Sequence, residues 1–323
     1  MPDNPFSPAV IGRFAPTPSG RLHLGNLFCA LLAWASAKSQ GGKIILRIED
    51  LDLERSPRAF ADQLETDLQW LGLDFDEGGS TGGAHQPYYQ SERFDIYQKF
   101  FHQLRQKAEV YPCFCSRASL HAASAPHLSD GRVLYPGTCY GLSPEAIRER
   151  QKRRPPASRV HLPDRVISFV DGIQGEVSAS LPADCGDFVV RRADGVYAYQ
   201  FAVVVDDGMM GVTQVVRGRD LLESTPVQIW LFETLGFSVP EFYHIPLLLD
   251  SEGRRLSKRD ADLDLSALRK RFLPEDIVGL LAFLAGQVPK WEQMTPKELA
   301  KIFRWERVPK QDICLPKGFE GKA

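Results

Sequence analysis

The chain lacks the features that place proteins in membranes or export them. No stretch of its 323 residues approaches the ~20 apolar residues that a membrane-spanning helix needs. The first residues, MPDNPFSPAVIGRF, do not join a basic segment to an apolar one, so they do not read as a signal peptide. We therefore expect a cytoplasmic protein that does not bind membranes.

The sequence also has little net charge, few cysteines and no repeats. Its 39 basic and 41 acidic residues leave a net charge of −2, whereas proteins that bind nucleic acid non-specifically are usually basic. Any contact with RNA should therefore be local. The six cysteines are not expected to form disulfides in the cytoplasm. Repeats and low-complexity tracts, which would indicate a solenoid or a disordered chain, are absent.

What the sequence does contain is an alternation of strands and helices. Apolar runs at 9–14 and 43–49 read as strands, and patterns at 24–38 and 91–107 read as helices. This alternation predicts parallel βαβ units and a doubly wound α/β sheet. It returns after residue 187 with DFVVRR and YAYQFAVVVDD. We interpret Asp206 and Asp207 there as a pair at the end of a strand.

Between these two α/β segments, short β-rich runs and a basic helix break the pattern. We predict one half of the catalytic domain over 1–110, an insertion over 111–187 and the second half over 188–250. Residues 251–323 should form a basic loop and a small helical region, with helices near 274–284 and after Thr295-Pro296. The length is consistent with about two domains.

Two motifs suit a polyphosphate. PTPSG…HLGN at 16–26 lies between a strand and a helix, where backbone N–H groups and the helix dipole favour anions. The loop RRLSKR at 254–259 offers four basic side chains to a departing pyrophosphate. Taken alone, His23 is more often a helix cap or surface residue, and the basic loop is more often merely solvated.

Two further clusters have local roles. Cys113 and Cys115 are followed by Cys139, 24 residues after Cys115, and three thiolates of this kind can bind tetrahedral Zn²⁺. Spacing alone gives equal weight to separate buried thiols. Residues 147–165 contain seven Arg or Lys against Glu149 and Asp164, which is either an RNA contact or a solvated helix end.

Taken together, HLGN and RLSKR match the two signatures of class I aminoacyl-tRNA synthetases, HIGH and KMSKS. LRIEDLDLER, YAYQFAVVVDD and VVRGRDL lie between them in family order. Through about Asp260, the chain resembles the glutamyl-tRNA synthetase group, and within it the short glutamyl-queuosine tRNA(Asp) synthetases. The implied fold is a Rossmann-like catalytic domain with an inserted α+β zinc domain that receives the tRNA acceptor arm.

The resemblance also implies site residues. Those assigned to glutamate are Arg13, Phe14, Ala15, Pro16, Thr17, Glu49, Tyr199 and Arg217. Those assigned to ATP are His23, Gly25, Asn26 and Lys258, of which His23 and Lys258 are catalytic. The chemistry agrees, because glutamate carries two carboxylates and one ammonium, and arginine binds carboxylates bidentately. Structural salt bridges from Arg13 or Arg217 to Glu49, Asp206 or Asp207 are the alternative.

The implied cofactors are one structural Zn²⁺, with ATP and Mg²⁺ entering as substrate. The resemblance assigns the zinc to Cys113, Cys115, Tyr135 and Cys139. The segment between Cys115 and Tyr135 is longer than is usual in the family, so His121 or His127 is an alternative fourth ligand. We assign no Mg²⁺ role to the aspartate pair.

The implied activity is ATP-dependent activation of L-glutamate without tRNA, followed by transfer to queuosine in the anticodon of tRNA(Asp). From Asp260 to Ala323 only 64 residues remain, too few for the anticodon-binding region of a full glutamyl-tRNA synthetase. We expect a monomer, although the residues do not determine oligomeric state. The alternatives are an authentic synthetase that charges tRNA(Glu) and a non-catalytic, zinc-containing RNA-binding protein. The intact Arg13, Glu49, His23 and Lys258 argue against the latter.

Overall fold

The computed structural model describes residues 9–116, 134–254, 256 and 264–316. Its centre is a parallel five-stranded sheet in the order β10–β9–β1–β2–β3. The strands are β1 (Ile11–Phe14), β2 (Lys43–Leu46), β3 (Glu77–Gly78), β9 (Gln214–Gly218) and β10 (Glu241–Ile245). Strand order reverses between β1 and β9. Doubly wound sheets bind ligands at the carboxyl ends of the strands at such a switch point.

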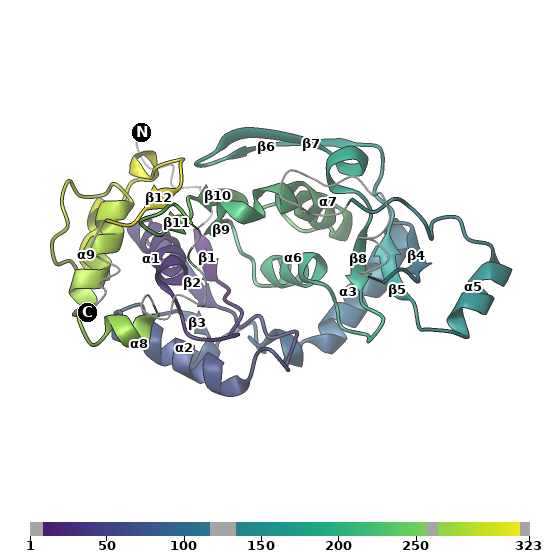
Figure 1. Cartoon of the computed structure of the whole chain (residues 1–323), viewed down its shortest axis with the longest axis horizontal. Helices are drawn as coiled ribbons and strands as arrows, with labels where there is room; N and C mark the ends of the chain where they lie inside the picture. The colour runs from purple at the N-terminus through teal and green to yellow at the C-terminus, as the bar shows by residue number, and fades with distance from the viewer. Residues whose placement is uncertain (1–8, 117–133, 255, 257–263, 317–323) are drawn as a thin grey trace.

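Helices cover both faces of this sheet (Figure 1). The helices α1 (Leu24–Ser39) and α2 (Arg58–Trp70) pack in one apolar cluster. The helices α3 (Phe94–Lys107), α6 (Tyr199–Met209) and α7 (Thr225–Leu235) pack in the other. In β2, Ile44 and Leu46 belong to the first cluster and Ile45 to the second. A strand that is buried on both faces is apolar, which explains the run of Ile44, Ile45 and Leu46, all buried, after the exposed Lys43. The predicted doubly wound fold is therefore confirmed.

The interpretation of Asp206 and Asp207 as a strand end was wrong, because both residues lie in helix α6. The five residues before them, 201–205, are all buried. A short helix that is surrounded by core loses the 3.6-residue alternation that distinguishes it from a buried strand.

The inserted region forms one end of the elongated molecule, with helix α5 (Pro144–Gln151) at its tip (Figure 1). The strands β4 (Val110–Cys113), β5 (Ala157–Val160) and β8 (Phe188–Arg191) make an antiparallel sheet. A hairpin of β6 (Val166–Asp171) and β7 (Gly175–Ser180) runs back beside α7 towards β10. The predicted domain boundary at 110/111 falls within β4, and the one at 187/188 separates β8 from the other two strands of its sheet. The division into domains stays a prediction.

The C-terminal region holds α8 (Leu265–Leu268), α9 (Pro274–Leu284) and α10 (Pro296–Ile302). The helix α9 has the predicted bounds, and Thr295 caps α10 through a capping box with Glu298. Strands β11 (Leu248–Leu249) and β12 (Ile313–Cys314) pair in parallel beside them. Across the described ranges, no helix has both the length and the apolar character needed to cross a membrane.

Candidate active site

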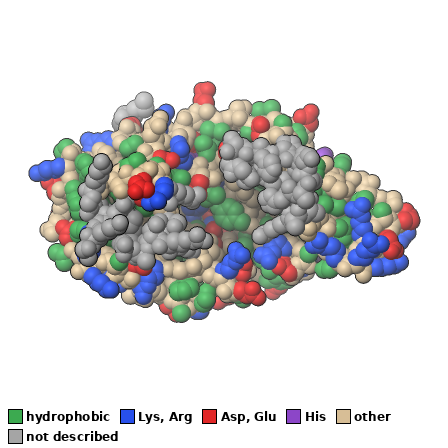
Figure 2. Space-filling view, viewed as in Figure 1, with side chains coloured by type: hydrophobic (Ala, Val, Ile, Leu, Met, Phe, Trp, Pro, Cys, Tyr) green, Lys and Arg blue, Asp and Glu red, His purple; other side chains and the backbone are tan. Residues whose placement is uncertain are grey.

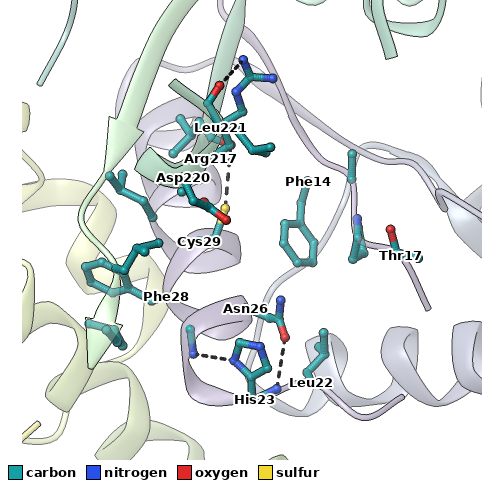
Figure 3. Close-up of a pocket in the computed structure, with 18 of the residues that line it drawn as sticks. Phe14, Thr17, Leu22, His23, Asn26, Phe28, Cys29, Arg217, Asp220 and Leu221 are labelled. Atoms are coloured by element: carbon teal, nitrogen blue, oxygen red, sulfur yellow. Dashed lines mark hydrogen bonds between the residues drawn. The ribbon is translucent and has the colours of Figure 1, made fainter. Parts of the chain in front are cut away.

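A cavity of about 490 Å³ lies at the strand-order switch point, between the carboxyl ends of β1 and β9 (Figure 3). Its lining includes the following predicted site residues: Arg13, Phe14, Ala15, Pro16, Thr17, His23, Gly25, Asn26, Glu49, Tyr199 and Arg217. Leu256, within the run RLSKR, also lines it. Lys258 lies outside the described residues. The fold thus brings segments that are far apart in the sequence into one pocket.

His23 is the N-cap of α1. Its Nδ1 accepts the backbone N–H of Gly25 at 3.1 Å, and Asn26 Oδ1 accepts the backbone N–H of His23 at 3.3 Å. A Cβ on Gly25 would lie 3.1 Å from the His23 ring, so a larger residue would crowd the cap. The cap reading is therefore correct for the local structure. The same residue lines the pocket at the positive end of α1, where negative charge is favoured.

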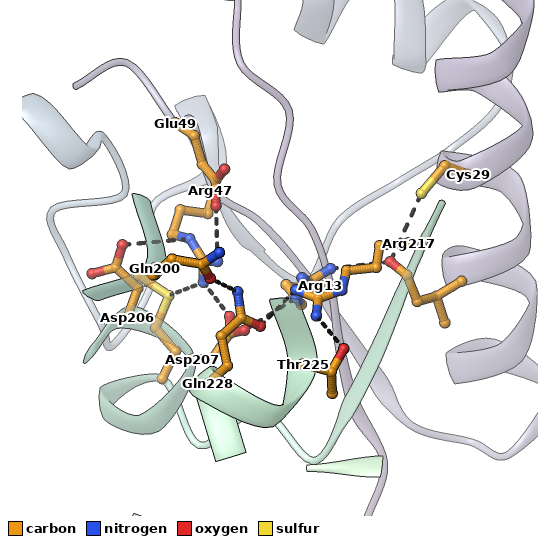
Figure 4. A network of polar contacts seen from close by, with 12 residues as sticks. Arg13, Cys29, Arg47, Glu49, Gln200, Asp206, Asp207, Arg217, Thr225 and Gln228 are labelled. Carbon is orange, nitrogen blue, oxygen red and sulfur yellow. Dashed lines mark hydrogen bonds and ion pairs between the residues drawn. The ribbon is translucent and has the colours of Figure 1, made fainter. Parts of the chain in front are cut away.

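Arg217 is buried and donates only to neutral acceptors among the described residues. Its Nε bonds His244 Nε2 at 3.0 Å, and its Nη1 bonds Gln228 Oε1 at 2.7 Å. Its Nη2 bonds Thr225 Oγ1 at 2.9 Å (Figure 4). No carboxylate in the described part of the chain forms an ion pair with Arg217. A buried, uncompensated charge is costly, and at functional sites a ligand supplies the missing partner.

Arg13 has a carboxylate partner within the protein. Its Nε lies 3.4 Å from Asp207 Oδ2, and its Nη1 donates to Val216 O at 3.1 Å. The salt-bridge alternative is therefore correct for one contact of Arg13 and is not observed for Arg217 in the described residues. Arg13 nevertheless lines the pocket with Arg217, so one wall carries two guanidinium groups.

A negative charge in the pocket comes from Glu49, which forms an ion pair with Arg47. Arg47 is fully buried and contacts Glu49 Oε1 at 3.2 Å and Asp207 Oδ1 at 2.6 Å. Burial raises the pKa of Glu49, and the positive charges of Arg47 and Arg13 oppose that rise only in part. A ligand ammonium beside Glu49 would stabilise its ionised form.

Asp206 and Asp207 both form ion pairs with buried arginines. Asp206 accepts from Arg93 Nε at 2.7 Å and from Tyr97 Oη at 2.9 Å, and Asp207 bonds Arg47 and Arg13. Neither aspartate lines the cavity. These ion pairs indicate that both aspartates of helix α6 have a structural role.

A second cluster lies in the inserted region. The sulfur atoms of Cys113, Cys115 and Cys139 all lie within 4.8 Å of one another, and those of Cys115 and Cys139 are 3.7 Å apart. A tetrahedral ion with metal–sulfur bonds of about 2.3 Å separates its sulfurs by about 3.8 Å. The three cysteines can therefore hold a metal ion, which is one of the two possibilities that their spacing left open and the one that the family resemblance implies.

Tyr135 lies against the three thiols. Its Oη lies 3.6 Å from Cys113 Sγ and 3.9 Å from Cys115 Sγ, and it accepts the backbone N–H of Cys139 at 2.8 Å. The guanidinium of Arg159 stacks 3.7 Å from the centre of its ring. Burial opposes ionisation of Cys113, but the Cys115 N–H, the Arg159 charge and Tyr135 together lower its pKa. His121 and His127 lie outside the described residues, so the fourth ligand stays a prediction.

Sequence reasoning missed the residues that orient Arg217, namely His244, Thr225 and Gln228, together with Asp171, which bonds His244. One signal was available. His244 is a polar residue at an inward position of a predominantly apolar strand, and such a side chain is normally paired.

The sequence model described as tRNA synthetases class I (E and Q), catalytic domain, matches residues 9–315. A glutamyl-Q tRNA(Asp) synthetase of Symbiobacterium thermophilum is 51% identical over 311 residues, which are 95% of this chain and 96% of that protein. The chain belongs to the glutamyl-Q tRNA(Asp) synthetase family. The family predicted from the motifs is thus confirmed.

The family is related to longer synthetases. A glutamate–tRNA ligase of Sulfurihydrogenibium sp. is 40% identical, and the match covers 92% of this chain but 63% of that protein. The crystal structure of a glutamate tRNA ligase from Elizabethkingia meningosepticum, in complex with its amino acid, superposes with a TM-score of 0.82 at 31% identity. That match covers 96% of this chain and 67% of the ligase. The class I synthetase fold expected for the family is therefore present.

Proposed function

We propose that this chain activates L-glutamate with ATP and transfers the glutamyl group to queuosine in tRNA(Asp). The observation that carries the proposal is the buried guanidinium of Arg217, which has only neutral partners among the described residues and shares its pocket with Glu49. This arrangement requires a ligand that is anionic at one point and cationic at another. The name of the 51%-identical relative supports queuosine as the acceptor.

In the proposed activation step, an α-carboxylate oxygen of glutamate attacks the α-phosphorus of ATP. The new O–P bond forms as the bond to the bridging oxygen breaks, and pyrophosphate leaves. The α-carboxylate is already ionised at pH 7, so no general base is needed. The site contributes position and charge, and Mg²⁺ bound to ATP shares the phosphate charge.

The geometry suggests how the ligands would lie. Figure 3 draws Arg217 and His23 at opposite ends of the pocket lining. His23, at the start of α1, would face the ATP phosphates together with Gly25, Asn26 and Lys258. Arg217 would then hold the carboxylate farther from the phosphates, the side-chain carboxylate of glutamate. Glu49 would pair with the α-ammonium, and Arg13, Tyr199 and the backbone of 14–17 would line the rest of the site.

The protein should exchange pyrophosphate into ATP in the presence of glutamate and without tRNA. Glutamine and aspartate should be at least about 10³-fold poorer in kcat/KM, because a neutral amide or a shorter side chain leaves the buried Arg217 unpaired. The exchange assay with each amino acid measures this directly. Equal exchange with glutamine would contradict the proposed substrate.

The acceptor is tested separately. Glutamate should be incorporated into queuosine-containing tRNA(Asp), and not into the same tRNA with unmodified guanosine. Trimming the 3′ CCA should leave acceptance unchanged, because a hydroxyl of the queuosine cyclopentenediol forms the ester. If trimming abolishes acceptance, or if tRNA(Glu) is charged efficiently, the chain is an authentic glutamyl-tRNA synthetase.

Two features of the inserted region support the RNA and metal parts of the proposal. Lys and Arg side chains gather at the end of the molecule that carries α5 (Figure 2), where they would contact the phosphates of the anticodon loop. Zn²⁺ would be held by Cys113, Cys115, Cys139 and Tyr135 as a closed, four-coordinate structural site. Such a site stabilises the fold and takes no part in the reaction.

A further inference from the structure

The groups that orient Arg217 leave its charge intact. All three of its nitrogens donate to neutral acceptors, and the acceptor for Nε is a ring nitrogen, His244 Nε2, at 3.0 Å. A carboxylate in that place would orient the guanidinium equally well but would neutralise it. The pocket therefore keeps a full positive charge for its ligand.

This arrangement requires one tautomer of His244. Its Nε2 accepts from Arg217 only if the ring is neutral and carries its proton on Nδ1. Nδ1 lies 2.6 Å from Asp171 Oδ2, and a carboxylate can only accept, so Asp171 places the proton there. Both side chains are fully buried. Burial lowers the pKa of His244 and outweighs the opposing effect of Asp171, which keeps the ring neutral.

Asp171 comes from the inserted region, at the end of β6 in the β6–β7 hairpin. Its Oδ1 accepts the backbone N–H groups of Ile173 at 3.0 Å and Gln174 at 2.8 Å, which fixes the carboxylate. The backbone N–H of Gly172 donates to Phe242 O at 2.8 Å in β10. A Cβ on Gly172 would lie 2.1 Å from the Tyr243 ring. The hairpin turn is thus seated on the strand that carries His244.

We infer that Asp171 and His244 are positioning residues that make the pocket select a carboxylate over an amide. Asp171 sets the tautomer of His244, and His244 aims the Arg217 guanidinium without cancelling its charge. The inference rests on the proposed function, because it concerns glutamate against glutamine in the same site. It also gives the hairpin of the inserted region a role in choosing the amino acid.

Asp171→Asn tests the inference with almost no change of shape. Three backbone N–H groups, those of Ile173, Gln174 and His244, bond Oδ1, so the Asn oxygen takes that position and its NH₂ faces His244 Nδ1. The amide N–H groups require an acceptor, so the ring proton moves from Nδ1 to Nε2. The Nε2–H then points at the Nε–H of Arg217, and the two donors repel each other. In the exchange assay we expect the KM for glutamate to rise about 10- to 100-fold. The glutamate-over-glutamine ratio should fall by a similar factor, with an unchanged KM for ATP.

The matched control is Gln174→Ala, which removes another contact of the same turn, from Gln174 Nε2 to His244 O at 2.9 Å. It leaves the tautomer alone, so the KM for glutamate should stay within about twofold of the wild-type value. A glutamate KM unchanged in Asp171→Asn overturns the inference. A parallel rise in both KM values with a lower melting temperature does so too, because it indicates a structural role.

Nitrogen-15 NMR of the wild-type histidines provides a readout that needs no variant to fold. A neutral His244 with its proton on Nδ1 supports the inference, and a proton on Nε2 or a charged ring overturns it. If the wild-type protein activates no glutamate, the proposed function fails whatever the tautomer. If it activates glutamate and Asp171→Asn behaves like the wild type, only the inference fails.

Discussion

Replacing Arg217 by methionine should lower kcat/KM for glutamate by about 10²- to 10⁴-fold, because the side-chain carboxylate of glutamate would lose the guanidinium that is proposed to bind it. The free energy of unfolding should change by no more than about 1–2 kcal/mol, since no carboxylate among the described residues depends on Arg217. Exchange kinetics and denaturant unfolding of the same preparation measure the two effects.

The chain contains a matched control in Arg47, a second buried arginine with the opposite environment. Arg47 lies within 4.0 Å of Glu49, Asp206 and Asp207. Arg47→Met removes a positive charge that three buried carboxylates share, so it should cost at least about 3–5 kcal/mol of stability. Figure 4 shows both arginines in one polar network. If Arg217→Met destabilises the protein as much as Arg47→Met, then Arg217 is a structural residue and the proposed glutamate site is wrong.

The purified protein should contain about one zinc ion per chain, and Cys113→Ser should reduce this to below about one ion in ten chains. Structural zinc contributes roughly 10–16 kcal/mol of apparent binding free energy in small domains, so its loss should unfold the inserted region before the catalytic domain. Metal analysis gives the stoichiometry, and hydrogen exchange of β4, β5 and α5 reports the local unfolding.

Cys314→Ser is the control for the zinc experiment, since Cys314 is exposed and lies outside the cluster. It should retain the full metal content. Unchanged zinc in Cys113→Ser would refute the ligand assignment. Among Tyr135→Phe, His121→Ala and His127→Ala, the variant that loses zinc affinity identifies the fourth ligand.

Several features could be predicted because they depend on local residue order. The alternation of strands with helices indicated a doubly wound sheet, and Thr295-Pro296 indicated the start of a helix where the structure has α10. Motifs between a strand and a helix indicated where its ligand would bind, since such a turn always lies at a strand's carboxyl end. The Cys-x-Cys pair left a metal cluster and separate buried thiols equally open, and the family resemblance favoured the cluster that the structure can form.

Other features depend on contacts between distant segments. The sequence read Asp206 and Asp207 as a strand end, because periodicity cannot separate a buried helix from a buried strand. It did not show that β8 completes the sheet begun by β4, since pairing partners are chosen by packing. Both features depend on which segments pack around a residue, and those segments come from distant parts of the chain.

By itself, the sequence determined which chemical groups this protein has: two arginines and a glutamate that the family resemblance assigns to an amino acid, a histidine at a helix start, and three thiols. The tertiary structure decided which of these charges remain uncompensated. Arg13 and Arg47 reach Asp207 on α6, more than 150 positions away in the chain, whereas Arg217 reaches only neutral acceptors among the described residues. The state of a buried charge depends on what surrounds it in three dimensions, and local sequence does not specify those neighbours.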